Sequence, residues 1–314
     1  MKGFICLILA GIIIDCAQAQ LLSTPTPTWK VTLKVVDDAA QPVSGAKVVV
    51  GYMFTNQITG LTDRNGVFVA SHRDKSFGLG FLVTKEGYYM TRREYEMGWA
   101  YQYDKNKAKW NPMETIVLRK FGNPIPMYAR RKESGMELQK EDEPIGFDLM
   151  AGDWVAPFGV GSKTDIFFTV HRKIINDQEF DCTLKVSFPN KGDGIVAALS
   201  EPCAGSEFQT SRTAAESGYE SGLDLHYSNT NRPESVFGYF IRVRTELDEI
   251  GNVKSALYGK IRGDFKFYPG TIKPHSGMGF DYYLNPTPND HNLEFDPKHN
   301  LSTNLKSLEG VNAP

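Results

Sequence analysis

The 314-residue chain has no excess of charge of either sign and, after its first residues, no long apolar run. Its 35 lysines and arginines nearly balance 37 aspartates and glutamates, and both signs are spread along the whole length. Because no basic stripe exists to neutralise phosphates, nucleic acid is not an expected partner. A membrane-spanning helix needs about 20 apolar residues, so we expect no transmembrane segment once the N-terminal leader is removed.

Cysteine is also scarce. The chain has four, and two of them, Cys6 and Cys16, fall in that leader. In an exported chain, two remaining cysteines pair more often than they stay free, so a Cys182–Cys203 disulfide is predicted. The alternative is two buried, reduced thiols. A metal site is disfavoured because no histidine lies near either cysteine in the sequence.

Recognisable catalytic motifs are absent as well. The segment 159–164 looks faintly like a phosphate loop, but Ser162 stands where glycine is needed before Lys163, and a strand is expected to follow. The six histidines show no zinc-ligand spacing, and no serine has the glycine spacing of a nucleophile elbow. The sequence therefore favours a non-catalytic protein without a cofactor.

What the chain does have at its start is an export signal. Lys2 precedes an apolar run at 3–14, and Ala17 and Ala19 form the small-x-small pattern of a cleavage site. Residues 1–19 are predicted to be a signal peptide, and the mature protein to be secreted or periplasmic. The alternatives are an uncleaved membrane anchor and a lipoprotein signal at Cys16, which Asp15 disfavours.

Residues 29–120 are predicted to form a compact β-unit. Val31, Leu33 and Val35 alternate with polar residues, which is the two-residue period of a strand with one buried face. At 62–66 the sequence Thr-Asp-Arg-Asn-Gly is typical of a hairpin turn, because Asp accepts backbone N–H groups and glycine adopts positive φ.

Three segments of this unit, at 41–48, 62–68 and 83–88, resemble the carboxypeptidase regulatory-like domain. The resemblance covers about 90 residues. It implies a prealbumin-like β-sandwich, a module that usually accompanies another domain, and it implies no activity. The insertion at 94–112 is longer than this family leads us to expect.

The rest of the chain is divided by composition. Prolines and mixed charge at 121–144 predict a linker, with a surface excursion of one larger domain as the alternative. Residues 145–304 are predicted to be a second β-rich domain, sandwich or jelly-roll-like, followed by a tail at 305–314. The whole chain is thus expected to be all-β. The expected strands of the second domain are 165–172, 179–188, 194–199, 237–247, 253–262, 264–268 and 278–284.

The second half of the chain resembles uncharacterised exported bacterial proteins through its segments 152–159 and 282–297, which implies no function.

The segment 285–300 is predicted to be a loop and is rich in asparagine, aspartate and proline. Carboxylate and amide oxygens suit Ca²⁺, so the loop is a candidate calcium or ligand site with Asn285, Asn289, Asp290, Asn292, Glu294 and Asp296 as donors. Alternatively, Leu293 and Phe295 fill the core while the polar side chains bond the loop's own backbone. Glu294, lying between these two, is then expected to point away from the core.

Aromatic residues suggest a second candidate surface, made of Trp154, Tyr282 and Tyr283. Together these features favour an exported, non-catalytic module that binds a polysaccharide, an envelope component or a protein. One alternative is a carbohydrate-active enzyme with carboxylates in the C-terminal domain, at Asp281, Asp290, Glu294 and Asp296. The other is a purely structural envelope protein.

Overall fold

The structure, a computed structural model, describes residues 28–52, 57–73, 78–96, 113–198, 205–271, 273 and 275–314. All regular elements in these ranges are β-strands, which confirms the all-β prediction. None of the described segments forms a helix long and apolar enough to cross a membrane. The predicted signal peptide and Cys203 lie outside the described residues.

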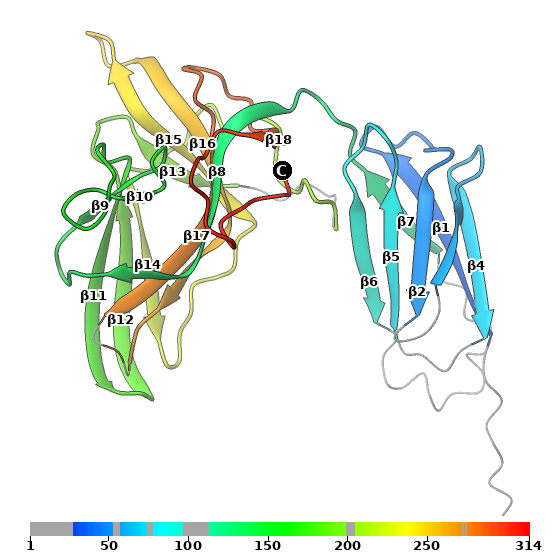
Figure 1. The fold of residues 1–314 in the computed structure, drawn as a ribbon, viewed down its shortest axis with the longest axis horizontal. Coiled ribbons are helices and arrows are strands. Elements are labelled where there is room, and N and C mark those ends of the chain that lie inside the picture. The colour runs from blue at the N-terminus through cyan, green and yellow to red at the C-terminus, as the bar shows by residue number, and fades with distance from the viewer. Residues whose placement is uncertain are drawn as a thin grey trace, which may run out of the picture.

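The first sandwich is built from two sheets (Figure 1). In one sheet the central strand pairs antiparallel on one side and parallel on the other. Its strands, in spatial order, are β4 (Val67–Arg73), β1 (Thr28–Asp37) and β7 (Met113–Leu118). The other sheet is wholly antiparallel. It contains β3 (Gln57–Leu61), β2 (Lys47–Tyr52), β5 (Gly78–Thr84) and β6 (Thr91–Glu96).

Alternating residues of these strands form the core of the first sandwich. Val31, Leu33 and Val35 of β1 are fully buried against Val48 of β2 and Val83 of β5. The predicted turn is present: the Asp63 carboxylate accepts the N–H groups of residues 65 and 67 at 2.8 Å. At its end Gly66 has φ +75°, and any side chain there would overlap the Val35 carbonyl oxygen. Glycine is therefore required at this position.

The second sandwich packs a five-stranded sheet against a six-stranded sheet. The five-stranded sheet contains β10 (Asp153–Trp154), β9 (Ile145–Asp148), β11 (Ile166–Asn176), β12 (Glu179–Ser187) and β14 (Gly222–Ser228). The six-stranded sheet contains β13 (Gly194–Ala197), β15 (Gly238–Leu247), β16 (Val253–Tyr268), β17 (Ser276–Leu284), β8 (Ile125–Leu138) and β18 (Phe295–Asn300).

Aromatic residues fill the space between these two sheets. Phe147 lies at the centre, with its ring 5.4 Å from Trp154, 5.3 Å from Phe280 and 6.1 Å from Tyr282. All three contacts are edge-to-face, the arrangement that aromatic quadrupoles favour. This cluster fixes how the sheets pack.

Cys182 belongs to the same core. On β12 the buried residues alternate, and Cys182 follows Phe180 on the inward face as a free, buried thiol. Burial raises the pKa of this thiol, as an apolar setting does. Its predicted disulfide partner Cys203 lies outside the described residues, and the Cys182–Cys203 bond stays a prediction.

The predicted linker at 121–144 is also wrong. Residues 125–138 of that segment form β8, which pairs with β17 and β18 inside the six-stranded sheet. Its charged residues have partners far away in the sequence. Arg131 bonds Asp281 directly across the β8–β17 ladder at 3.2 Å, and Arg130 bonds Glu309 at 2.8 Å.

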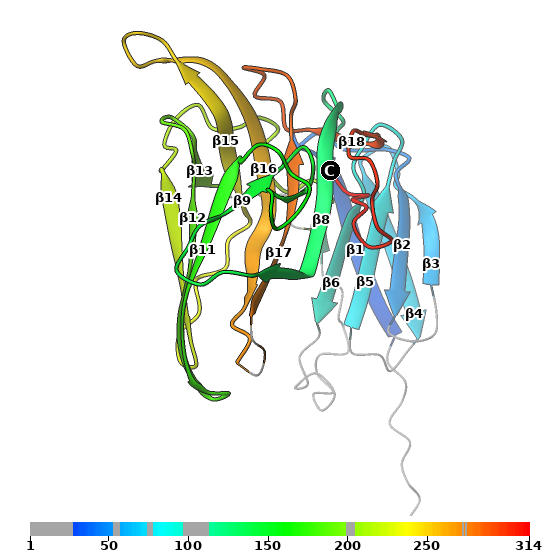
Figure 2. The ribbon, with the colours of Figure 1, turned by 60° about the vertical axis from the view of Figure 1, so that its left-hand side comes forward.

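The last ten residues are not a free tail either. Glu309 is buried and bonds both Arg130 and Lys132 at 2.8 Å. Val311 enters the apolar cluster on the outer face of the six-stranded sheet, and the Ala313 carbonyl accepts the Tyr283 hydroxyl at 2.8 Å. In both views, β18 and the C-terminal segment, in red, lie on the side of the second sandwich that faces the first (Figures 1 and 2). The domain boundary predicted at 304 is therefore wrong.

Candidate functional site

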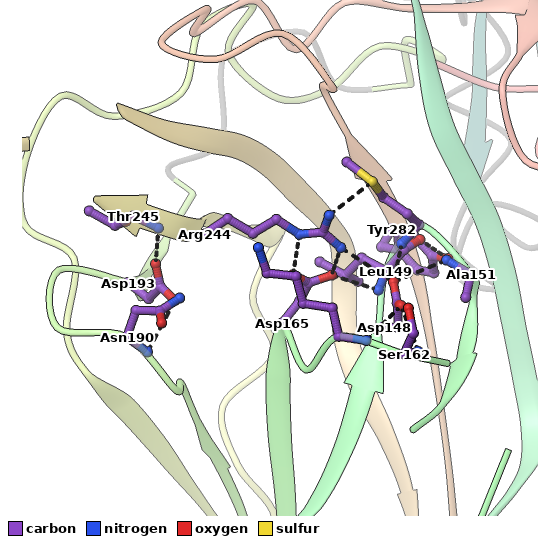
Figure 3. A network of polar contacts seen from close by, with 12 residues as sticks. Asp148, Leu149, Ala151, Ser162, Asp165, Asn190, Asp193, Arg244, Thr245 and Tyr282 are labelled. Carbon is purple, nitrogen blue, oxygen red and sulfur yellow. Dashed lines mark hydrogen bonds and ion pairs between the residues drawn. The ribbon is translucent and has the colours of Figure 1, made fainter. Parts of the chain in front are cut away.

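An arginine and two aspartates form a buried network between the two sheets of the second sandwich (Figure 3). Arg244 of β15 donates to both oxygens of Asp165, at 2.7 and 2.9 Å, and to Asp148 at 3.3 Å. Arg244 has φ +56° and lies where the β15–β16 register shifts. A register shift turns a side chain away from its regular direction, and here it aims the guanidinium at the two aspartates.

The segment 159–164, which looks faintly like a phosphate loop, binds the carboxylate of Asp148. The Asp148 Oδ2 atom accepts the backbone N–H groups of Ser162 and Lys163, both at 3.1 Å. Burial raises the pKa of Asp148, but the hydrogen bonds from Ala151, Ser162 and Lys163 outweigh burial and leave its pKa below the usual value. The loop thus binds the protein's own carboxylate in place of a phosphate.

The loop after β17 bonds to its own chain. Asn285 donates to the Asp290 and Asn292 carbonyl oxygens at 3.1 and 2.9 Å, and its Oδ1 accepts the Thr287 N–H. Asn289 Oδ1 accepts the Ala256 N–H at 3.0 Å. Asp290 Oδ1 accepts the Asn292 N–H at 3.0 Å. These oxygens face backbone N–H groups and do not converge on a common point.

Asp296 and Asn292, two further candidate calcium ligands, also bond to groups of the protein. The two carboxylate oxygens of Asp296 engage the Lys298 N–H and His299, and Asn292 Oδ1 accepts the Glu294 N–H. Within the described ranges, no three His, Cys, Asp or Glu side chains gather as a metal would require. Leu293 and Phe295 are fully buried, which confirms the alternative that they fill the core.

The predicted aromatic surface is also corrected. Trp154 is 6% exposed, and Tyr282 and Tyr283 are fully buried. The two tyrosines lie on opposite faces of β17, because neighbours on a strand point in opposite directions. Tyr282 packs between the sheets and donates to the Leu149 carbonyl at 2.7 Å, whereas Tyr283 joins the outer cluster. Both faces of this strand are covered, and Trp154 on β10 is buried as well, so the three rings form no exposed surface.

Glu294 joins the two sandwiches. It does not belong to the apolar cluster that contains Leu293 and Phe295, yet it is 1% exposed. Its carboxylate accepts the Tyr89 hydroxyl at 2.7 Å and the N–H groups of Gly122 and Asn123 at 2.7 and 2.8 Å. Burial, followed by the bond to Glu294, raises the pKa of Tyr89. The Glu294 carboxylate, which accepts three hydrogen bonds, therefore connects the two sandwiches.

Backbone pairing strengthens this junction. The Arg92 N–H of β6 donates to the Gly205 carbonyl at 2.7 Å, and the Glu207 N–H donates to the Met90 carbonyl at 2.9 Å. A side chain at Gly205, which has φ +85°, would overlap the Arg92 carbonyl oxygen. The segment that begins at Gly205 therefore adds to the edge of the first sandwich, and glycine permits the close approach.

A lysine is buried beside this junction. Lys260 of β16 is 1% exposed, and its Nζ atom has no hydrogen-bond partner among the described residues. The ammonium nitrogen lies 4.5 Å from the ring centroid of Phe208 and 4.8 Å from that of Tyr283. Burial, followed by repulsion from Arg262 and Arg119, lowers the pKa of Lys260 to about 7. No pattern in the sequence marks this lysine, because it occupies an alternating strand position that is usually solvated.

A groove opens in the second sandwich where β14, the end of β16 and the β16–β17 turn meet. Two cavities, of about 290 and 520 Å³, share Arg232 and Tyr268 as lining residues. The first is lined mainly by aromatic residues, among them Tyr227, Tyr239, Phe265 and Phe267. The second is mostly polar, with Glu137, Asp177, Lys273, His275 and Ser276 in its wall. These volumes fall in the range of natural ligand sites.

Arg232 stands where the two cavities join. Its guanidinium carbon lies 5.3 Å from the ring centroid of Phe180 and 5.9 Å from that of Tyr227. The side chain is exposed, and within the described part of the chain it makes no hydrogen bond or ion pair within the usual limits. Tyr227 is held in turn by its bond to the Phe265 carbonyl at 3.2 Å. Burial, followed by the nearby Asp264, raises the pKa of Tyr227 to about 12.

The sequence analysis did not find this groove. Its residues come from separate segments, around 137, 177–180, 225–239 and 264–277. The one local signal is Arg232-Pro233 in the polar loop that follows β14. An arginine before proline in such a loop is ordinary, and only the fold places it against two rings.

Comparison with known proteins adds little. No protein-family model matches the chain, and no curated protein matches it. Three solved structures share 11–13% identity with it. A shaft pilin of Lactobacillus rhamnosus GG covers 55% of this chain and 91% of its own, with a TM-score of 0.22. The major pilin subunit of Bacillus cereus covers 85% and 99%, with a TM-score of 0.23. A membrane-associated protein of unknown function from Bacteroides fragilis covers 83% and 98%, with a TM-score of 0.21. Scores this low support no argument about function.

Proposed function

We propose that this chain is an exported, non-catalytic binding module that holds a polysaccharide in the groove of its second sandwich. The observation that carries the proposal is Arg232, which lies near Phe180 and Tyr227, lines both cavities, and makes no hydrogen bond or ion pair with the described residues. Export rests on the N-terminal pattern of residues 1–19.

The groove has the composition of a saccharide site. The exposed Tyr268 supplies an aromatic ring, and polar residues of the wall supply hydrogen-bonding groups. Tyr268 is 46% exposed and lines both cavities, so one of its faces is open to a ligand. The two cavities share lining residues, so a ligand of several linked rings can occupy both.

The first sandwich fits an accessory role in this proposal. Its turns resemble those of the carboxypeptidase regulatory-like domain, a module associated with other domains. Glu294 and the backbone pairing at Gly205 attach it firmly to the second sandwich. The first sandwich would therefore set the distance and direction of the groove from whatever envelope component it contacts.

Two of the carboxylates that the sequence suggested for an enzyme are engaged away from the groove. Asp281 is paired with Arg131, and Glu294 accepts three hydrogen bonds in the junction. Neither of these two residues lines the groove.

Calorimetric titration of the mature protein with a panel of soluble polysaccharides tests the proposal. At least one should bind, and Tyr268→Ala should weaken that binding while leaving the unfolding midpoint unchanged, because the side chain is half exposed. Arg64→Ala, an exposed arginine in a turn of the first sandwich, is the matched control. No binding to any polymer, or turnover of one, would contradict the proposal.

A further inference from the structure

The charge of the ligand can be argued from the groove itself. Three acidic residues line it, Glu137, Asp177 and Asp264. None lies within ion-pair distance of Arg232 in the described structure. Asp264 instead accepts the Val236 N–H at 2.8 Å. An arginine that shares a groove with three acids and pairs with none keeps its donors available to a ligand.

The guanidinium of Arg232 lies near two aromatic rings. Its carbon is 5.3 Å from the ring centroid of Phe180 and 5.9 Å from that of Tyr227, within the range of cation–π attraction. An arginine guanidinium can bind a carboxylate through two parallel hydrogen bonds.

The wall beside Arg232 is also held in place. Arg172 donates to the carbonyl oxygens of Pro269, Gly270 and Lys273 at 3.2 to 3.3 Å, and thereby fixes the turn between β16 and β17. This turn carries Lys273 and His275 into the second cavity. Lys273 therefore adds a second basic side chain to the wall of the second cavity, while aromatic residues line the first.

From this arrangement we infer that the groove binds an acidic polysaccharide, with Arg232 bonded to a sugar carboxylate and Tyr268 stacked on a sugar ring. The inference rests on the proposed function and specifies its ligand. The three acids of the groove favour a singly charged carboxylate over a phosphate monoester, whose second charge they would repel. The exposed ring of Tyr268 favours a sugar ring over an acidic peptide.

The test is calorimetric titration of the mature protein with polygalacturonate, at about 150 mM salt so that long-range attraction is screened. The same polymer after chemical reduction of its carboxyl groups is the neutral comparison. We expect binding to polygalacturonate at least about tenfold tighter than to the reduced polymer, as the loss of a charged hydrogen-bond pair implies. Arg232→Ala should remove this preference, and Arg64→Ala should keep it.

Arg232→Lys separates the geometry of the site from its charge. A lysine keeps the charge but lacks the planar fork, so it should retain less than half of the preference. Equal affinity for both polymers would overturn the inference and leave the proposed function standing. Failure of both polymers and of the wider panel would overturn both. Equal binding of polyglutamate, or of a phosphate-bearing polymer, would also overturn it.

Discussion

Replacing Lys260 by methionine should stabilise the protein at neutral and acidic pH. The lysine is buried between Phe208 and Tyr283, and its Nζ atom has no hydrogen-bond partner among the described residues. A methionine has nearly the same length and no charge, so it fills the same space without a group that requires solvation. The change leaves Glu294, whose three donors come from other residues, with its bonds intact.

The size of the effect follows from the pKa of Lys260, which falls from 10.5 to about 7 on folding. At about 1.4 kcal/mol for each pH unit, this difference corresponds to about 5 kcal/mol. Below pH 7 the Lys260→Met protein should therefore be more stable than the wild type by up to about 5 kcal/mol.

The pH dependence has a definite sign. Below pH 7 the lysine is charged in both the folded and the unfolded chain, so the full cost of burying the charge is present. Between pH 7 and 10.5 only the unfolded chain holds the proton, so wild-type stability rises with pH by up to about 1.4 kcal/mol per unit. The methionine protein lacks this contribution, and the two stabilities should converge as pH rises.

Urea unfolding of both proteins at several pH values between 6 and 10, followed by fluorescence of the buried Trp154, measures this difference. Lys254→Met is the matched control, because Lys254 lies on the same strand and is exposed. It should change stability by less than about 0.5 kcal/mol. A difference between wild type and Lys260→Met that stays constant over this pH range, or a methionine protein that is less stable at pH 6, would refute the argument.

Three further changes probe the fold. Glu294→Gln should destabilise the protein by about 1 to 3 kcal/mol, because an amide leaves one of three buried donors without an acceptor; a neutral result in urea unfolding would contradict this. Arg244→Met should cost about 3 to 5 kcal/mol, since Asp165 would remain buried and charged, and partial rescue by adding Asp165→Asn is the control. The thiol of Cys182 should react with a thiol reagent only in denaturant, and rapid reaction in the native protein would show that β12 is misplaced.

The strands of the chain follow largely from local patterns. The β1 alternation, the turn at Gly66 and the strands corresponding to β11, β12, β13, β15, β16 and β17 were all predicted, because each depends on a two-residue period or on turn chemistry. These signals lie within a few residues of one another, so no knowledge of distant partners is needed to detect them.

The elements that escaped prediction depend on distant partners. The sequence of β8 is typical of a charged linker, because the partners of its charged residues are distant in the sequence. Glu309 lies 179 residues after Arg130, and Asp281 lies 150 residues after Arg131. β18 contains a proline and pairs parallel with β8, which a local pattern cannot indicate. A sequence window shows the charge of these residues but not the group that neutralises it.

The predicted site differs from the observed one because the observed site also depends on residues that are distant in the sequence. The sequence identified the loop after β17 as distinctive and offered core filling by Leu293 and Phe295 as one of two interpretations, which the burial of both side chains confirms. Only the tertiary structure decided that both faces of β17 are covered, that Glu294 joins two sandwiches, and that Lys260 is buried. The groove around Arg232 belongs wholly to this second group, because its walls come from segments that only the packing of two sheets brings together.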